Sequence, residues 1–398
     1  MSIFVHMVSY KNFDVIPTIR DCIEKSSDKD NLHFGVSLQQ DESTPHEIIH
    51  PRIKVHSVPF GESRGPGWAR SMAQSFYDGQ DYQMQIVSGS RFAEGWDEKL
   101  ISAIGQTGSP RAVITNYPNK YNASSGEKEL PEIAFRNQIY QMMAGMPVTW
   151  PSPMKGISSM LPSRWISNDF FFSHGSHCLD VKVDPELYYS ELESALTLRS
   201  FCAGYDIFNH FVPLVWKDYS PRAWNWNDDP EWWLKDRLSK ARFKNLVNNE
   251  EKGEYGFSGL RSVRDFEVYT GIDFKGKRLQ KSTVSGESPP CKYENDDQWE
   301  REYMKDYLIT VNWDVDQIEK CDDYDYWYFA VEDESGNIIN RQDLRLEQDA
   351  NLIQFKFNFK KIYFKATNKA VPARICIQPF SKSKGGLKKV KFDIRGAR

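Results

Sequence analysis

The sequence predicts two domains, an α/β domain built on a mostly parallel sheet and a smaller antiparallel β-sandwich that follows it. In the first 116 residues, short apolar and often β-branched runs alternate with stretches of helical spacing, which is typical of a parallel sheet covered by helices. Beyond residue 297 the runs alternate between apolar and polar residues, as strands with one buried face do. A length of 398 residues also exceeds the roughly 250 residues at which single cores stop growing.

The elements of the first domain follow one another along the chain. The predicted strands span residues 3–9, 33–39, 53–58, 82–88 and 111–116, and the predicted helices span residues 14–26, 64–78 and 95–105. After them the sequence predicts loops rich in Gly, Pro, Ser and Asn at 119–131 and 147–165, a helix over 189–202 and a strand over 211–216. Because ligands of such sheets bind at the carboxyl ends of the strands, we expect a site in the loops after residues 9, 39 and 88.

A polar stretch separates the two domains. Residues 276–296 contain Pro289-Pro290 and predict a linker, so the expected domains are 1–280 and 297–398. The second domain has predicted strands at 307–313, 326–332, 352–358 and 373–378, with a hairpin turn at 334–337. Its last stretch is basic and is either a solvated edge or a contact for nucleic acid, phosphorylated glycan or a membrane surface: Lys382, Lys384, Lys388, Lys389, Lys391, Arg395 and Arg398.

The composition excludes several classes of protein. Fifty-one Lys and Arg against 55 Asp and Glu leave a formal net charge of −4, so no global positive field attracts DNA or anionic lipid. No apolar run approaches the roughly 20 residues that a membrane-spanning helix needs. The six cysteines are scattered without a CxxC pair, which favours a reducing compartment. Met1 leads into the first predicted strand rather than into a cleavable apolar segment, so we predict a cytoplasmic protein with no membrane partner.

Several motifs occur in a characteristic order. The stretch 62–97 contains an Arg-Gly-Pro-Gly turn, an amphipathic helix, a buried strand and a small-residue turn. The other motifs are Ser9-Tyr10-Lys11, Thr115-Asn116-Tyr117-Pro118, Gly204-Tyr205-Asp206, Ser262-Val263-Arg264-Asp265-Phe266 and Thr270-Gly271-Ile272-Asp273-Phe274. Together they resemble the hydroxyproline-polypeptide N-acetylglucosaminyltransferases, a family of cytoplasmic enzymes with the Rossmann-like GT-A fold that use UDP-GlcNAc. The resemblance covers roughly residues 1–275 and does not extend to the β-sandwich.

The chain departs from this family at the metal site. The family pattern at the end of the central strand is commonly LQIDSHMRF, in which the Asp and the His bind a divalent cation, whereas residues 84–92 read MQIVSGSRF. Val87 and Gly89 therefore stand at the two ligand positions, and neither offers the oxygen or imidazole donor that Mn²⁺ or Mg²⁺ needs. The third family ligand is a His after a Val-Trp pair, and here Lys217 follows Val215-Trp216.

The loss of all three ligands has three explanations. In the first explanation, the ammonium of Lys217 replaces the cation opposite the diphosphate leaving group, as basic side chains do in some metal-independent transferases. Alternatively, the chain is an inactive, transferase-like module that binds sugar or protein, or it has an unusual metal site. We expect the first, that is, transfer with a UDP-sugar as donor substrate and with no metal or other cofactor.

The resemblance also implies the residues of the site. It places the uridine against the loop after the first strand, and it makes the helix over 64–78, which two arginines flank, a support of the nucleotide. These arginines can hold phosphates by forked hydrogen bonds. The nucleotide-sugar-binding residues expected on this basis are Ser9, Tyr10, Lys11, Arg64, Arg70, Val87, Ser88, Gly89 and Arg91. Either Arg64 or Arg70 alone is equally well explained as a partner in a salt bridge at the start of the helix.

The acceptor side differs more from the family. Glu193 matches the second Glu of the family's Gly-Glu-Glu, but Leu192 stands for the first, and Asp169 lies where the family has small residues. We expect Glu193, Lys217 and Asp169 as catalytic residues, and the resemblance implies retention at the anomeric carbon. The acceptor is a hydroxyl group, either on a polypeptide or on a hydroxymethylated base of DNA, the substrate of virus-encoded sugar transferases.

Overall fold

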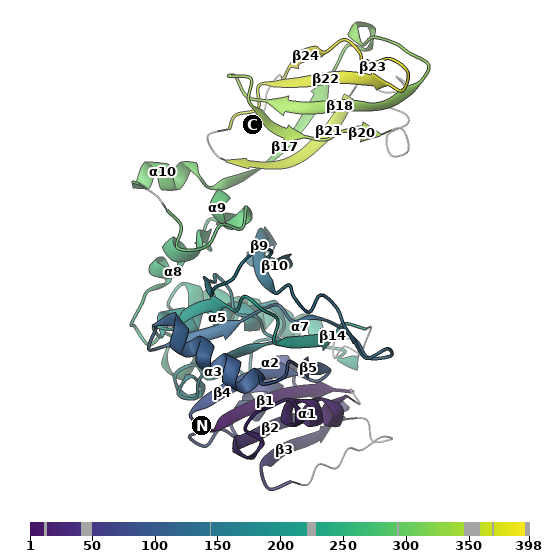
Figure 1. Ribbon diagram of the computed structural model, residues 1–398. Helices are drawn as coiled ribbons and strands as arrows, with labels where there is room; N and C mark the ends of the chain where they lie inside the picture. The colour runs from purple at the N-terminus through teal and green to yellow at the C-terminus, as the bar shows by residue number, and fades with distance from the viewer. Residues whose placement is uncertain are drawn as a thin grey trace. The chain divides into compact units, whose positions relative to one another are not determined.

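The computed structural model describes residues 1–11, 14–40, 50–143, 145–220, 228–292, 294–345, 359–367 and 370–394. The chain divides into two compact units, the first made of Met1–Lys277 and Ser282–Lys292 and the second of Arg278–Lys281 and Tyr293–Arg398 (Figure 1). The predicted strand at 352–358, together with Arg395 and Arg398 of the basic stretch, lies outside the described residues.

In the described residues, the helices are short to medium in length. They are α1 (Val15–Glu24), α2 (Pro66–Gln74), α3 (Trp96–Thr107), α4 (His177–Asp180), α5 (Ser190–Cys202), α7 (Trp232–Val247), α8 (Val263–Thr270), α9 (Lys281–Val284) and α10 (Asp296–Arg301). Single 3-10 turns occur at Lys29–Asn31, Phe60–Glu62, Gly253–Tyr255 and Val315–Gln317. In the part of the chain that the structure describes, no helix has both the length and the apolar surface needed to cross a membrane.

The strands fall into separate sheets. Those of the first unit are β1 (Ile3–Tyr10), β2 (Leu32–Gln40), β3 (Ile53–Pro59), β4 (Tyr82–Val87), β5 (Ser90–Phe92), β6 (Ala112–Thr115), β7 (Asn119–Asn122), β8 (Glu127–Lys128), β9 (Phe135–Met143), β10 (Met146–Pro153), β11 (Leu161–Pro162), β12 (Phe171–His174), β13 (Asp206–Asn209), β14 (Val215–Asp218) and β15 (Ile272–Asp273). Those of the second unit are β16 (Arg278–Leu279), β17 (Met304–Asn312), β18 (Tyr324–Glu332), β19 (Ile338–Arg341), β20 (Leu344–Arg345), β21 (Phe359–Thr367), β22 (Arg374–Ser381), β23 (Gly385–Gly386) and β24 (Val390–Asp393).

The central sheet of the first unit is mostly parallel. Among the described residues its strand order is β11-β13-β6-β12-β4-β1-β2-β3. Strands β1 to β4 run parallel to one another, and β12 runs antiparallel between β4 and β6. A smaller sheet has the order β5-β14-β7-β8, and β9 and β10 form a separate antiparallel pair. This arrangement confirms the predicted α/β class, with strands and helices close to the positions expected from the sequence.

Helices cover both faces of the central sheet. On one face α1 and α3 pack against β1, β2, β4 and β6 in a core that includes Trp96, which is fully buried. On the other face α5 packs through Leu196 against β6, β12 and β13. Strand β4 alternates between these environments: Met84 and Ile86 belong to the first core, whereas Gln83 and Gln85 lie on the side of α5 and are 0% and 1% exposed. Two glutamine side chains therefore lie buried directly before the end of the central strand.

Helix α2 approaches the chain before α5 closely because its first turn contains Gly67. A Cβ atom added at Gly67 would lie 2.1 Å from the carbonyl oxygen of Leu187 and 2.8 Å from that of Asp184. Both neighbours are backbone atoms, so a side chain at this position displaces either the helix or the loop. The glycine thus sets the position of a helix that also carries Arg70.

Replacing Gly67 by alanine is expected to destabilise the first unit by about 1–3 kcal/mol, because the added methyl group overlaps main-chain oxygen atoms. The midpoint of urea unfolding measures this change. Gly61→Ala is the matched control, since nothing lies within 4 Å of a Cβ atom added there. Equal midpoints for the two variants would contradict the close approach of α2.

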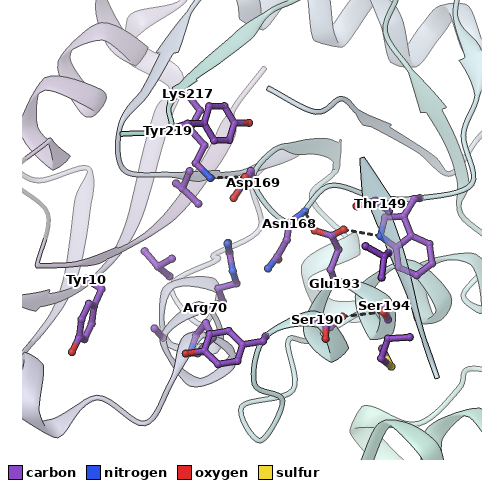
Figure 2. Close-up of a pocket in the computed structure, with 18 of the residues that line it drawn as sticks. Tyr10, Arg70, Thr149, Asn168, Asp169, Ser190, Glu193, Ser194, Lys217 and Tyr219 are labelled. Atoms are coloured by element: carbon purple, nitrogen blue, oxygen red, sulfur yellow. Dashed lines mark hydrogen bonds and ion pairs between the residues drawn. The ribbon is translucent and has the colours of Figure 1, made fainter. Parts of the chain in front are cut away.

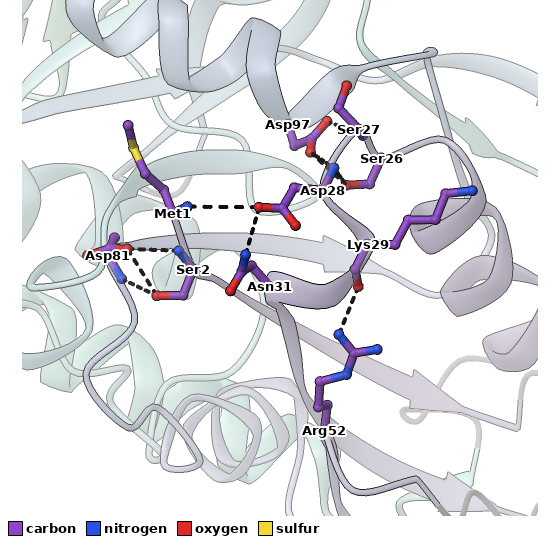
Figure 3. Close-up of polar contacts among 10 residues, drawn as sticks. All are labelled: Met1, Ser2, Ser26, Ser27, Asp28, Lys29, Asn31, Arg52, Asp81 and Asp97. Carbon is purple, nitrogen blue, oxygen red and sulfur yellow. Dashed lines mark hydrogen bonds and ion pairs between the residues drawn. The ribbon is translucent and has the colours of Figure 1, made fainter.

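A buried carboxylate fixes α3 to the loop after α1. Asp97 accepts hydrogen bonds from Ser26 Oγ at 2.6 Å and from the amides of Ser27 and Asp28 at 2.9 Å each, as Figure 3 shows. Its side chain is buried, and these hydrogen bonds outweigh the effect of burial and hold the pKa of Asp97 below its usual value. The contact fixes how α1 and α3 pack together on their side of the sheet.

Three sequence predictions are wrong in detail. The stretches 119–131 and 147–165 were expected to be loops, but they contain β7, β8 and most of β10. Strand β10 carries Pro147, Pro151 and Pro153 and pairs with β9 alone among the described strands, and proline is tolerated on such an edge strand. The strand expected over 211–216 begins only at Val215, after Pro213.

The second unit is an antiparallel β-sandwich, as predicted. One sheet pairs β17 with β21, and the other has the order β19-β18-β22-β23, with β20 beside β18 and β24 beside β22. The two sheets share one core that includes Ile309, Trp327 and Ile377. The expected turn at 334–337 connects β18 to β19, with Gly336 at a φ of +85°.

Candidate active site

A cavity of about 700 Å³ lies at the carboxyl ends of β1, β2 and β4, where the sequence places a site. Helices α2 and α5, strand β14 and the β9–β10 hairpin complete its wall. The residues that line it are Val8, Tyr10, Gln39, Pro66, Ala69, Arg70, Val87, Ser88, Met143, Met146, Pro147, Val148, Thr149, Trp165, Asn168, Asp169, Tyr189, Ser190, Glu193, Ser194, Lys217, Asp218, Tyr219, Ser220 and Lys240.

Lys217 reaches this cavity from β14 and is paired with a carboxylate. Its Nζ lies 2.6 Å from Asp169 Oδ2, and the two side chains are 20% and 26% exposed (Figure 2). The ammonium also lies 4.8 Å from the centre of the Tyr219 ring. Burial raises the pKa of Asp169, but the charge and hydrogen bond of Lys217 and the charge of Arg70 outweigh it, so the pKa lies below its ordinary value. The site therefore holds a lysine–aspartate ion pair.

Arg70 contributes a second cation from α2. The residue is 5% exposed, and among the residues that the structure describes no acceptor lies within hydrogen-bond reach of its Nε or Nη1. Burial lowers the pKa of Arg70 to about 10 against the opposite influence of Asp169 and Glu193, so the guanidinium stays charged at neutral pH. Figure 2 shows the side chain pointing from its helix toward Asn168 and Asp169. A buried cation with unused donors is suited to binding an anionic group.

Glu193 on α5 is held in place by two donors. Its Oε1 accepts from Trp165 Nε1 at 2.6 Å and its Oε2 accepts from the amide of Asn168 at 3.0 Å. Burial raises the pKa of Glu193 to about 7, although both hydrogen bonds and Arg70 act to lower it. Near neutral pH this carboxyl group is therefore present in both protonation states and can accept or donate a proton.

The structure brings seven of the predicted site residues together around the cavity. They are Tyr10, Arg70, Val87, Ser88, Asp169, Glu193 and Lys217. These residues come from β1, α2, the end of β4, the segment before β12, α5 and β14, and they include all three of the residues expected to be catalytic.

The other five predicted residues do not line the cavity. Ser9 is buried and its carbonyl oxygen accepts from Gln39 Nε2, and the amide of Gly89 donates to Thr18 Oγ1 at 2.9 Å. The three cations have local partners: Lys11 pairs with Asp228 at 3.0 Å, Arg91 makes two hydrogen bonds of 2.9 Å to Asp14, and Arg64 lies 5.9 Å from the centre of the Trp68 ring. A role for these five in nucleotide binding stays a prediction.

The residues at the end of β4 do not form a divalent-cation site. Val87 and Gly89 provide no side-chain ligand there. Across the described ranges, no group of three or more His, Cys, Asp or Glu side chains is arranged to hold a metal ion. Asp169 is the carboxylate of the cavity that faces Lys217, and its Oδ2 is engaged by that ammonium. The side chains at these two positions therefore do not provide the ligands that the family resemblance implies, and the absence of a metal stays a prediction.

Sequence reasoning placed residues 147–165 in a loop over a cleft and so missed that one wall of the cavity is a β-hairpin, and it missed one residue near Lys217. The wall is the β9–β10 hairpin, which contributes Met143, Met146, Pro147, Val148 and Thr149. The residue is Tyr219, whose ring stacks on Tyr117 with centres 5.5 Å apart. A signal for Tyr219 was present, since it lies two residues beyond Lys217 on the same segment. The hairpin had no such signal because its prolines are typical of a loop.

Comparison with solved structures finds proteins of low sequence identity. The chain is similar to S. aureus TarS residues 1–349, with 11% identity and a TM-score of 0.38 over 64% of this chain and 67% of that chain. It is also similar to S. aureus TarS, with 11% identity and a TM-score of 0.36 over 99% of this chain and 86% of that chain. A third similar structure is GalNAc-T7 with UDP, GalNAc and Mn²⁺, with 13% identity and a TM-score of 0.46 over 67% of this chain and 56% of that chain. No curated protein sequence matches the chain.

A match to a family model assigns the chain to a family, which the similarity to these structures does not do. The model "Glycosyltransferase (GlcNAc)" matches residues 43–276, which is more than half of the chain. The matched stretch includes Arg70, Asp169, Glu193 and Lys217, and it agrees with the GT-A-like class expected from the sequence. The chain therefore belongs to the GlcNAc glycosyltransferase family.

Proposed function

We propose that the chain transfers a sugar from a UDP-sugar, with GlcNAc as the first candidate, to a hydroxyl group without a divalent cation. The observation that carries the proposal is the position of Lys217, whose ammonium lies at the cavity on β14 while β4 ends without a metal ligand. Family membership supports the sugar transfer itself. The replacement of the family's ligands by Val87 and Gly89, together with Lys217 at the cavity, supports the assignment of the charge-stabilising role to side chains.

Two cations are available to the departing diphosphate. Lys217 is held by Asp169 before the donor binds, and a diphosphate beside the ammonium competes with this carboxylate for it. Arg70 has donors on Nε and Nη1 that no described residue uses. A partly buried lysine and a buried arginine stabilise developing negative charge more strongly than exposed side chains would, because water screens them less.

The family resemblance suggests that the configuration of the anomeric carbon is retained. The bond between this carbon and the phosphate oxygen breaks, and the acceptor oxygen forms its bond on the same face of the sugar. The acceptor proton moves to the departing phosphate oxygen, so no strong base is required. In this scheme Lys217 and Arg70 stabilise the leaving group, and Glu193 accepts a hydrogen bond that orients a sugar or acceptor hydroxyl.

The wall opposite the cations favours an acceptor hydroxyl on an uncharged group. The β9–β10 hairpin presents Met143, Met146 and Val148 to the cavity. Lys240 is the further cation of the lining, and it pairs with Asp236. A phosphodiester backbone, as in DNA, would need several cations beside it. We therefore place a polypeptide hydroxyl ahead of a hydroxymethylated DNA base as the acceptor.

The proposal is tested by incubating the purified chain with a panel of UDP-sugars and measuring release of UDP, with and without EDTA. We expect turnover of at least one UDP-sugar that continues in the presence of the chelator. Turnover that stops in EDTA and returns only with added Mn²⁺ would show that a metal performs the role assigned here to Lys217 and Arg70.

The pH dependence of turnover is expected to follow the ionisation of the Glu193 carboxyl group. Because its pKa is about 7 and the ionised form is the acceptor of a hydrogen bond, kcat/KM should rise with pH through a midpoint near 7. In Glu193→Gln this step should be absent. Glu186→Gln is a control, since Glu186 lies before α5 and does not line the cavity. An unchanged midpoint in Glu193→Gln would assign the titration to another group.

A further inference from the structure

Three buried polar atoms belong to two residues that line the same small cavity. Arg70 Nε, Arg70 Nη1 and Gln85 Oε1 are buried, and none of the three has a hydrogen-bond partner among the described residues. Arg70 and Gln85 both line a second, small cavity of about 10 Å³, which Asn168 also lines. A volume of about 10–15 Å³ accommodates one water molecule, provided that two or more polar groups face it. The space and the unused donors and acceptor therefore match one water molecule.

The orientation of the Gln85 amide is fixed by its other end. Its Nε2 donates to the carbonyl oxygen of Asn168 at 2.8 Å and lies 3.3 Å from Asn168 Oδ1. Both contacts are acceptors, so the nitrogen must face Asn168 and the oxygen must face the small cavity. Gln85 Oε1 is thus available to accept from a water molecule, and that water can in turn accept from Arg70.

Gln85 is connected through Asn168 to Glu193 and to the Asp169–Lys217 pair without lining the larger cavity. Asn168, which it holds, donates its amide to Glu193, and the next residue, Asp169, pairs with Lys217. A displacement of Asn168 therefore moves the partners of both Glu193 and Lys217. On the other side, a water molecule between Gln85 and Arg70 would set the position of the guanidinium.

We propose that one buried water molecule binds between Arg70 and Gln85, and that Gln85 is a positioning residue for the donor site. The water accepts a hydrogen bond from one of the two Arg70 donors, Nε or Nη1, whose N–H bonds point to opposite sides of the guanidinium, and it donates one to Gln85 Oε1. This satisfies two of the three buried groups, each of which costs about 1–3 kcal/mol when left unpaired, and it leaves the other Arg70 donor for the diphosphate. The positioning role rests on the proposed function, because it assumes that Arg70 and Lys217 bind the diphosphate. The water molecule itself does not depend on that function.

A crystal structure of the full chain tests the water directly. We expect a density peak within hydrogen-bond distance of Arg70 Nε or Nη1 and of Gln85 Oε1. An empty space, or a direct contact between Arg70 and Gln85, would overturn the water site whether or not the chain turns over a UDP-sugar.

The positioning role is tested with Gln85→Leu and Gln83→Leu. Gln83 is the matched control because it is equally buried on the same face of β4 but bonds to His6 and Ser173 rather than to Asn168. We expect both variants to unfold at lower urea concentration, but only Gln85→Leu to lower kcat/KM, by about tenfold, with weaker binding of UDP in calorimetry. Equal kinetic effects of the two variants would overturn the role.

A second variant covers the case in which Gln85→Leu does not fold. Gln85→Glu keeps the size of the side chain and places a carboxylate beside Arg70, which pairs with the guanidinium and competes with the diphosphate. We expect folded protein with an affinity for UDP lower by about tenfold and with a smaller change in kcat. Unchanged UDP affinity in Gln85→Glu would show that Arg70 is not positioned through residue 85.

Discussion

Lys217→Ala is expected to lower kcat/KM for sugar transfer by about 10²–10³-fold, the range found when one donor that stabilises transition-state charge is removed. The physical reason is that Lys217 provides the cation on β14 at the cavity, while no described residue at the end of β4 binds a metal that would substitute for it. The measurement is release of UDP and of glycosylated acceptor in EDTA, with the folded fraction of each variant checked by thermal unfolding.

The effect of leaving Asp169 without its partner must be distinguished from the effect of losing the cation itself. Removing Lys217 leaves Asp169 without its hydrogen-bond partner at 2.6 Å, which adds negative charge to the site. The double variant Lys217→Ala with Asp169→Asn removes both charges. If stabilisation of the diphosphate is the role of Lys217, the double variant stays as slow as Lys217→Ala within about tenfold, because the cation is still absent.

Lys240→Ala is the matched control for these variants. Lys240 also lines the cavity, but it comes from α7 and pairs with Asp236 four residues earlier. Its removal should change kcat/KM by less than about threefold, since an exposed pair of this kind contributes little. Activity of Lys217→Ala equal to that of Lys240→Ala would contradict the replacement of the metal by a lysine.

The sequence pattern was most informative where one physical rule determined the structure. Strands β1, β2 and β4 were predictable because their apolar runs are buried on both faces of a parallel sheet, and the cavity lies where the carboxyl ends of these strands meet. Strand β10 was not predictable, because Pro147 and Pro151 are typical of a loop and only the pairing with β9 makes them part of a strand.

The candidate site was predictable only in part. Arg64, Arg70 and Arg91 are equivalent in a sequence, and what distinguishes them is the tertiary partner of each. Arg91 is held by Asp14, the residue directly before α1, whereas Arg70 points into the site with unused donors. The pairing of Lys217 with Asp169, 48 residues away, could not be predicted from the sequence pattern either, although Asp169 itself was a candidate.

Acid is expected to destabilise the first unit through two buried histidines, His6 and His177. They are 1% and 0% exposed, and His6 bonds to Gln83 Oε1 at 2.7 Å while His177 bonds to Ser200 Oγ at 2.8 Å. Burial lowers the pKa of His6 to about 4 and, with the charges of His6 and Arg199, that of His177 to about 3. Both are therefore neutral in the folded chain at pH values at which they are protonated in the unfolded chain.

The sign of the effect follows from the number of bound protons. Between the unfolded pKa of 6.5 and the folded values, the unfolded chain binds more protons, so stability falls as pH falls through this window. Glu193 acts in the opposite direction, because its raised pKa makes the folded chain bind more protons between about 4.5 and 7. Glu193 therefore offsets part of the loss of stability that the two histidines cause in acid.

His177→Gln isolates one of these contributions, because glutamine can keep a hydrogen bond to Ser200 but does not titrate. The loss in free energy of unfolding between pH 7 and pH 4.5 should be smaller in this variant by about 2–3 kcal/mol, from a shift of several pKa units. Urea unfolding at the two pH values measures it, with His50→Gln as an exposed control. An equal loss in free energy of unfolding in His177→Gln and in the unchanged chain would mean that His177 is already protonated in the folded state. The packing of a neutral ring between Phe171 and Tyr205 would then be wrong.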